Sequence, residues 1–180
     1  NSIAQYEKHR GTIEEHNKQA VTRGGQRMRP VSIGIRINPE YSTQEGHAIY
    51  DPCAPGSRLG ITFRQLQQDL AKPGMACAGD SVYELPEDIE GLHFHTLCEQ
   101  DADDLVFEEK FQPYLTKVKW LNLGGGHHIT REGYQLDKLM ELIGYIKKTY
   151  QLEVYLEPGE AVALNAGYFV TEVLDVVHNG

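Results

Sequence analysis

The sequence lacks long apolar runs and lacks closely paired cysteines. No stretch approaches the roughly 20 consecutive apolar residues that a membrane-spanning helix needs, so we expect no membrane partner. Cys53, Cys77 and Cys98 are its 3 cysteines, and they are widely spaced. Scattered, unpaired cysteines indicate reduced thiols in a cytoplasmic protein rather than a disulfide framework.

Positive charge is also scarce. Lys and Arg number 17 against 26 Asp and Glu, which gives a net charge of -9 and a pI near 5.3. This balance argues against a nucleic-acid partner and is compatible with a cationic substrate. The composition is 40% hydrophobic and 24% charged, which is typical of a folded globular chain.

The chain has no initiator methionine either. Its first residues, Asn1-Ser2, resemble the interior of a longer chain, and its last, Asn179-Gly180, fall where a turn would begin. We therefore expect a fragment of a larger protein.

Strand-like and helix-like segments alternate along the chain. We predict strands over residues 31–37, 89–95, 118–123, 151–156 and 168–177, and helices over residues 3–17, 62–71, 101–111 and 135–150. Ser2, Thr62 and Asp101 are the expected helix caps. Residues 72–86 show no assignable pattern. The last helix is expected to bury one apolar face, made of Leu136, Leu139, Met140, Ile143 and Ile146.

Such alternation requires parallel strands joined by helical crossovers, as in a doubly wound sheet or a (β/α)8 barrel. Polar groups follow three of the predicted strands: His95 to Cys98, Gly124 to Gly126, and Glu157 to Glu160. Barrel enzymes gather their chemistry at the carboxyl ends of strands, so this recurrence favours the barrel. The GxGxxG spacing of a dinucleotide-binding fold is absent.

Three consecutive glycines, Gly124, Gly125 and Gly126, end the strand at residues 118–123. Each glycine costs roughly 0.5–1 kcal/mol relative to alanine in regular structure. The run is either a flexible turn or a place where backbone N–H groups approach an anion closely, and phosphate is the first candidate.

His93 and His95 lie two residues apart and point to the same side of their strand. With His127-His128 and Cys98 they could form a zinc site, so a metal-dependent barrel hydrolase using His93, His95 and His127 is one alternative. A structural histidine with a satisfied hydrogen bond is the other interpretation of His93.

Glu157 ends an apolar strand, where a carboxylate is costly unless a cation or a protonated nitrogen meets it. Glycine amides for a phosphate, a flat imidazole and a carboxylate for a ring nitrogen together match the needs of pyridoxal phosphate.

Five motifs in order carry a resemblance to a known family. The chain resembles the pyridoxal-phosphate-dependent decarboxylases of the alanine-racemase-like fold, also called fold type III, and its motif order is most similar to the carboxynorspermidine (carboxyspermidine) decarboxylases. The motifs are RINPE (36–40), PGSRLGI (55–61), GLHFHTLCE (91–99), LNLGGGH (121–127) and LEPGEA (156–161).

This resemblance implies the architecture. Residues 1–166 would form central and late strands of a (β/α)8 barrel, and residues 167–180 would begin the passage into a C-terminal β-domain. The family is usually homodimeric, with active sites shared between subunits. Its coenzyme is pyridoxal 5'-phosphate.

The resemblance also implies roles for cofactor-binding residues. His95 would stack on the coenzyme ring, Glu157 would hold the ring nitrogen, and Cys98 would stand where relatives often carry serine near the phosphate. Glycines would contact the phosphate: Gly125, Gly126 and Gly159.

Two further residues, Arg58 and Glu160, are the predicted substrate contacts. Related branches carry EPGR, in which the arginine helps the phosphate, but position 160 here is Glu. We expect Glu160 to face a cationic polyamine substrate.

The resemblance places no catalytic residue in this chain. The Schiff-base lysine is expected upstream of Asn1 and a catalytic cysteine segment downstream of Gly180, so the fragment alone would be inactive. The expected function of the intact enzyme is decarboxylation of carboxynorspermidine or carboxyspermidine to norspermidine or spermidine, in polyamine biosynthesis. The alternatives are a diaminopimelate- or ornithine-type amino-acid decarboxylase and a non-catalytic pyridoxal-phosphate-binding barrel protein.

Overall fold

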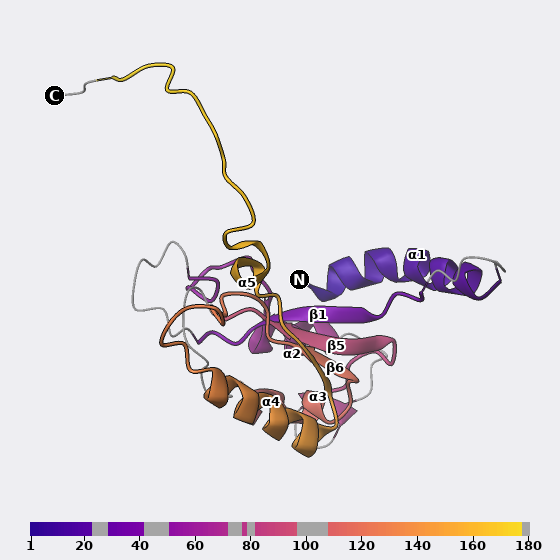
Figure 1. Ribbon diagram of the computed structural model, residues 1–180. Helices are drawn as coiled ribbons and strands as arrows, with labels where there is room; N and C mark the ends of the chain where they lie inside the picture. The colour runs from indigo at the N-terminus through magenta and orange to yellow at the C-terminus, as the bar shows by residue number, and fades with distance from the viewer. Residues whose placement is uncertain (23–28, 42–50, 72–76, 79–81, 97–107, 178–180) are drawn as a thin grey trace.

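Five parallel strands form the central sheet of the computed structural model, which describes residues 1–22, 29–41, 51–71, 77–78, 82–96 and 108–177 (Figure 1). The strand order is β2-β1-β5-β6-β7. Every neighbouring pair in this sheet is parallel, as the sequence predicts. The strands are β1 (Ile33–Asn38), β2 (Ile61–Thr62), β5 (Ile89–Phe94), β6 (Trp120–Asn122) and β7 (Glu153–Tyr155).

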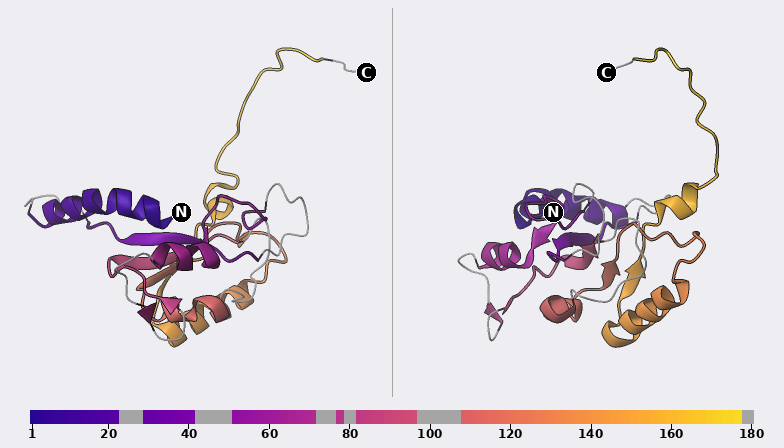
Figure 2. Two further views of the ribbon diagram at one scale, coloured as in Figure 1. Left: turned by 180° about the vertical axis from the view of Figure 1, so that it is seen from behind. Right: turned by 90° about the vertical axis from the view of Figure 1, so that its left-hand side faces the viewer.

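Helices occupy the crossovers that parallel strands require. In Figures 1 and 2, α2, α3 and α4 cover one face of the sheet, α1 runs beside β1, and α5 follows β7. Residues 72–86, which showed no pattern in the sequence, contain two short antiparallel strands, β3 (Cys77–Ala78) and β4 (Val82–Tyr83). The helices are α1 (Ile3–Thr22), α2 (Phe63–Leu70), α3 (Glu108–Leu115), α4 (Leu136–Tyr150) and α5 (Gly159–Ala163). No helix in the described part of the chain is long and apolar enough to cross a membrane.

Two predicted caps are confirmed. The Ser2 hydroxyl accepts a hydrogen bond from Gln5 N at 3.2 Å, and the Thr62 hydroxyl accepts one from Gln65 N at 3.2 Å. Helix α1 continues to Thr22, beyond its predicted end at residue 17. The Asn17 side chain does not end the helix, because it bonds the backbone N and O of Val31 and so ties α1 to the chain before β1.

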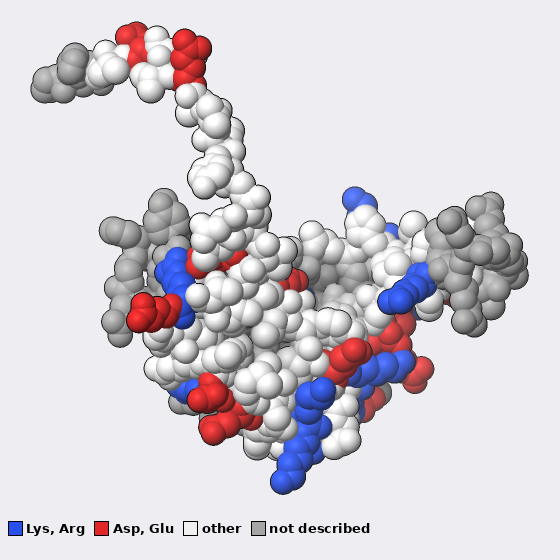
Figure 3. Space-filling view, in the orientation of Figure 1, with Lys and Arg blue, Asp and Glu red and all other residues white. Residues whose placement is uncertain are grey.

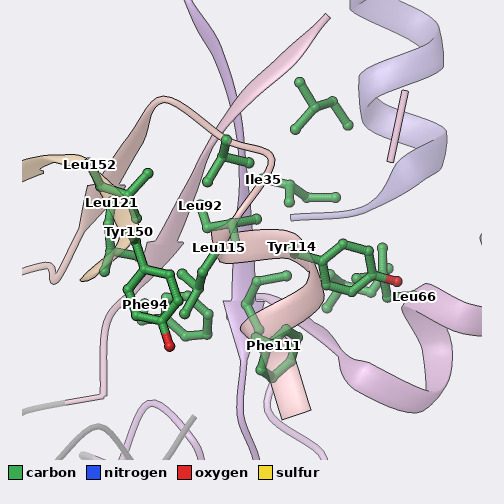
Figure 4. Packing of buried hydrophobic residues seen from close by; sticks show 14 of the residues in the cluster. Ile35, Leu66, Leu92, Phe94, Phe111, Tyr114, Leu115, Leu121, Tyr150 and Leu152 are labelled. Carbon is green, nitrogen blue, oxygen red and sulfur yellow. The ribbon is translucent and has the colours of Figure 1, made fainter. Parts of the chain in front are cut away.

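The hydrophobic core lies between the sheet and α2, α3 and α4 (Figure 4). Phe111 is at its centre, with ring centroids 5.3 Å from both Phe63 and Phe94 in edge-to-face geometry, a favourable arrangement for aromatic pairs. Other core residues labelled in Figure 4 are Ile35, Leu66, Leu92, Tyr114, Leu115, Leu121, Tyr150 and Leu152.

Helix α3 ends later than predicted, at Leu115 rather than Phe111. Tyr114 and Leu115 lie three and four residues after Phe111 and are buried with it, so they extend one helical face into the core. The predicted cap, Asp101, lies outside the described residues.

The predicted apolar face of α4 is wrong in part. Leu139 and Ile146 are buried and Ile143 is half-buried, but Leu136 and Met140 are 47% and 60% exposed. The helix instead turns Leu142 and Tyr150 toward the core. The apolar stripe is wider than the face that the sheet covers, so the sequence pattern alone could not orient it.

The predicted strand over residues 168–177 is also wrong. This segment is extended but has no strand partner among the described residues, and it leaves the body of the molecule after α5 (Figure 1). Tyr168 and Phe169 are 99% and 94% exposed. Alternating apolar residues make a strand only when a neighbour accepts their backbone hydrogen bonds.

On the face of the sheet opposite the helices, the register places side chains of neighbouring strands side by side, so that they form rows across the sheet. One row consists of Gly34, Gly91, Trp120 and Glu153. The Trp120 ring lies over both glycines, since a Cβ at Gly91 would be 2.0 Å from Trp120 Cδ2 and one at Gly34 would be 2.1 Å from Cη2. The next row, two residues closer to the carboxyl ends, is Arg36, His93, Asn122 and Tyr155.

Candidate functional site

The carboxyl ends of β5, β6 and β7 bring together the polar groups that the sequence singled out. His95 follows β5, the glycines follow β6, and Glu157 follows β7. His93 and His95 each offer a ring nitrogen and Glu157 offers a carboxylate oxygen that could bind a ligand, and these three atoms lie within 4.8 Å of one another. Parallel strands therefore convert three distant segments into one site.

The glycine loop is packed directly against His95. Gly124 and Gly126 have positive φ angles of 74° and 83°, which favour glycine. A Cβ at Gly124 would lie 2.8 Å from His95 Cγ, and one at Gly125 would lie 3.2 Å from His95 Cε1. The loop therefore needs glycine both for its backbone conformation and for the close approach of the imidazole.

Asn122 holds Glu157 in place, and nothing in the sequence indicated this role. Asn122 Nδ2 donates to Glu157 Oε1 at 2.8 Å, while Asn122 Oδ1 accepts from Gly124 N at 2.8 Å. Glu157 N also donates to Gly124 O at 2.9 Å. One amide side chain thus fixes the carboxylate relative to the glycine loop.

The His93 and His95 rings lie next to each other in the site. Their ring centroids lie 5.9 Å apart with planes tilted by 55°, and His93 Nε2 is buried without a hydrogen-bond partner. Burial lowers the pKa of both imidazoles, and the nearby Arg36 charge lowers each further, while Glu157 acts in the opposite direction. Both rings are therefore held neutral at neutral pH.

Gly159, which the family resemblance predicts to contact the phosphate, uses its backbone amide within its own turn. Its N–H donates to Glu157 O at 2.8 Å. Pro158, with φ -78° and ψ 72°, has the angles of an inverse γ-turn, and that turn closes an i to i+2 hydrogen bond. Pro158 and Gly159 form a rigid turn. The Gly159 N–H already donates to Glu157 O within this turn.

Glu160 is paired with an arginine that sequence reasoning missed. Arg131 donates to Glu160 through Nε to Oε1 and through Nη2 to Oε2, each at 2.9 Å. His128 Nε2 lies 3.6 Å from the same Oε2. These hydrogen bonds and the Arg131 charge lower the pKa of Glu160. Arg131 and His128 lie in the loop after the glycines, so the pairing became visible only in the tertiary structure.

His127 does not belong to the group of described residues with metal-ligand spacing. It is buried, its Nδ1 lies 3.1 Å from Tyr134 Oη, and burial lowers its pKa. Among the described residues, the cluster with metal-ligand spacing is His93, His95 and Glu157. The alternative ligand set of His93, His95 and His127 is therefore not the one that the described residues form.

The other predicted site residues are less informative. Cys98 lies outside the described residues, and Arg58 is exposed in the loop before β2. That loop does reach the site, because the buried Cys53 Sγ lies 4.0 Å from His95 O. Gly60, with φ 105°, also packs against Asn38 N, where a Cβ would be 2.8 Å away, so the RINPE and PGSRLGI motifs meet in space.

The described charges are intermixed rather than gathered in a single patch on the face seen in Figure 3. Lys117 pairs with Glu84 and Lys119 pairs with Glu90. Both lysines precede β6 and therefore lie at the amino end of the strands, opposite the site.

Comparison with known proteins gives clear similarities over nearly the whole chain. No protein-family model matches it. The chain is 37% identical, over 99% of its length, to the carboxynorspermidine/carboxyspermidine decarboxylase of Campylobacter jejuni, of which it covers 40%. It is 37% identical to the carboxyaminopropylagmatine decarboxylase of a Synechocystis strain, over 82% of this chain and 35% of that protein.

A solved structure is similar as well. The crystal structure of carboxynorspermidine decarboxylase from Campylobacter jejuni, complexed with norspermidine, matches 99% of this chain with a TM-score of 0.62 and 36% identity. The match covers 39% of that structure's chain. The chain thus spans about two fifths of the length of the relatives it matches.

Proposed function

We propose that this chain, which is similar over nearly all its length to carboxynorspermidine/carboxyspermidine decarboxylases, is the site-bearing barrel portion of such an enzyme. Its reaction is the decarboxylation of carboxynorspermidine or carboxyspermidine to norspermidine or spermidine, in polyamine biosynthesis. The observation that carries the proposal is the convergence of His95, the glycine loop and Glu157 at one edge of the parallel sheet.

The residues at this edge fit pyridoxal 5'-phosphate. The His95 ring is flat, half-buried and pressed on Gly124 and Gly125, so the loop leaves no side chain in the way of a planar ligand. Glu157 presents a carboxylate that Asn122 orients. His93 Nε2 is buried without a hydrogen-bond partner among the described residues, and His93 offers a ring nitrogen within 4.8 Å of the ligand atoms of His95 and Glu157.

The roles of these residues follow from their chemistry. Glu157 would hold a proton on the ring nitrogen of the coenzyme, because a carboxylate favours a protonated partner nearby. His95, kept neutral by burial, covers the ring face without adding a charge that would compete with that proton. Gly125 and Gly126 would border the phosphate. A coenzyme held here would supply an electron-accepting ring for the electron pair that stays on the substrate carbon when the carboxylate leaves as carbon dioxide.

The wider organisation is part of the same proposal. Residues 1–166 belong to a (β/α)8 barrel and residues 167–180 to the passage toward a β-domain. The intact enzyme is a cytoplasmic homodimer with shared active sites. We assign no catalytic residue to this chain, and Lys117 and Lys119 are poor candidates for a coenzyme lysine because they lie at the opposite end of the strands.

The test uses the intact protein and two variants in which a glutamate is replaced. Glu157 directly follows β7, and Glu153 lies within β7. The wild type is expected to bind pyridoxal phosphate with visible absorbance and to release carbon dioxide from carboxynorspermidine or carboxyspermidine. Glu157→Gln should lower kcat by about 100-fold or more, since it removes the group that holds the ring proton. Glu153→Gln, an exposed control on β7, should retain wild-type kcat.

The same assay separates the alternatives. Coenzyme binding without carbon dioxide release from any substrate would favour a non-catalytic carrier. The substrate panel should include carboxyaminopropylagmatine, diaminopimelate and ornithine. Faster turnover of diaminopimelate or ornithine than of both carboxylated polyamines would contradict the proposed substrate.

A second candidate is a metal-dependent hydrolase, because His93, His95 and Glu157 also have the spacing of metal ligands. Two imidazoles and a carboxylate suit zinc and related divalent ions. Elemental analysis of the purified intact protein distinguishes the two functions. One tightly bound zinc ion per chain, lost in His93→Gln, would replace the coenzyme proposal.

A further inference from the structure

Arg131 and Glu160 join the two loops that border the site. Arg131 lies in the loop that follows the glycine run, and Glu160 directly follows Gly159 at the start of α5. Their two parallel hydrogen bonds, each 2.9 Å long, fix the guanidinium in both distance and orientation. A bidentate pair of this kind positions the charge far better than a single contact does.

The pair lies at the surface and is only partly shielded from water. The Glu160 side chain is 25% exposed and the adjacent His128 side chain is 11% exposed, while Arg131 is 49% exposed. Charges that are partly withdrawn from water are screened less.

The negative charge of Glu160 must be compensated if an anion is to bind beside it. A lone carboxylate one residue from Gly159 would repel an anion placed between the two glycine segments. Arg131 offsets that negative charge where the two loops meet, and its guanidinium is a cationic hydrogen-bond donor there. Because the Gly159 amide is used inside its own turn, a positive side chain has more to contribute here than backbone alone.

We propose that Arg131, held by Glu160, is a further coenzyme-binding residue that supplies the positive charge for the phosphate at the glycine loop. The proposal rests on the proposed function. Glu160 is then a positioning residue for Arg131, and its carboxylate is already engaged rather than waiting for a substrate amine.

The phosphate contribution can be measured separately from the rest of the coenzyme. In the intact, coenzyme-free protein, absorbance titration gives Kd for pyridoxal phosphate and for pyridoxal, which lacks the phosphate. The ratio of the two constants reports on the phosphate site alone. Arg131→Gln should lower this selectivity for pyridoxal phosphate on the order of tenfold, as loss of a charged hydrogen-bond donor does.

Two further variants make the test specific. Glu160→Gln keeps an acceptor for the guanidinium and removes the negative charge, so the selectivity should stay level or rise. Arg64→Gln, an exposed arginine on α2, is the matched control and should leave both constants unchanged. If Arg131→Gln does not fold, Arg131→Lys keeps the charge without the fork and should lose part of the selectivity.

The possible outcomes are distinct. An Arg131 variant that weakens both ligands equally, or neither, overturns the proposal, because the arginine would then be structural or irrelevant to the phosphate. A fall in selectivity with Glu160→Gln as large as that with Arg131→Gln also contradicts it. Failure of the wild type to bind either ligand would instead contradict the proposed function.

Discussion

At the scale of single residues, glycine has two different uses in this chain. Gly124 and Gly126 need positive φ angles, and Gly124 also makes room for His95. Gly34 and Gly91 are needed for a different reason, because the Trp120 ring rests on them. The sequence marked the first pair through the glycine run, but nothing in it connected the second pair with Trp120. Cross-strand register made that connection.

Gly91→Ala should destabilise the intact protein by about 2–3 kcal/mol, because the new methyl group overlaps the Trp120 ring, which must shift. Gly144→Ala is the control. A Cβ at this exposed helical position meets nothing within 4 Å, so alanine should stabilise by about 0.5–1 kcal/mol. Chemical denaturation measures both. Equal effects of the two substitutions would contradict the packing of Trp120 on Gly91.

At the scale of elements, periodicity located the helices and strands better than it oriented them. The strands over residues 89–95 and 118–123 and the helix over residues 135–150 were predicted within a few residues of their observed bounds. The rotation of α4 about its own axis was not predicted correctly. Its five apolar residues form a wide stripe, and several rotations of the helix would bury part of that stripe. The sheet decides which of these residues are buried.

Helix α4 allows a direct comparison between neighbouring positions. Leu139→Ala should cost about 2–4 kcal/mol, since Leu139 is 1% exposed and its loss leaves a cavity. Met140→Ala should change stability by less than about 0.5 kcal/mol, because this side chain is on the outer face. Thermal unfolding of the two variants measures the difference. A larger loss at Met140 would show that its face is covered in the intact protein.

At the scale of the whole molecule, the site concentrates imidazoles in a partly buried place. Burial is the leading cause that lowers the pKa of His93, His95 and His127 below the ordinary value of 6.5. Below pH 6.5 the unfolded chain therefore binds more protons than the native one. Stability is full above that pH and falls as the pH decreases.

We expect the coenzyme-free intact protein to melt at progressively lower temperature as the pH falls from 7 to about 5. Each histidine with a lowered pKa changes the free energy of unfolding by at most about 1.4 kcal/mol per pH unit. His127→Gln removes one of the three groups and should flatten the dependence. His9→Gln, on the exposed side of α1, is the control and should leave the pH dependence of the melting temperature unchanged. A pH dependence of stability that is unchanged by His127→Gln would contradict this account.

The sequence by itself determined the class of the molecule and most of its site. Alternating apolar periodicities required parallel strands, and polar residues just after strands had to meet at one edge, so His95, the glycine loop and Glu157 could be predicted to converge. The tertiary structure alone decided which side chains assist them. Asn122 reaches Glu157 because β6 and β7 are in register, and Arg131 reaches Glu160 because two loops touch. Such contacts depend on register and loop paths, which local sequence patterns do not specify.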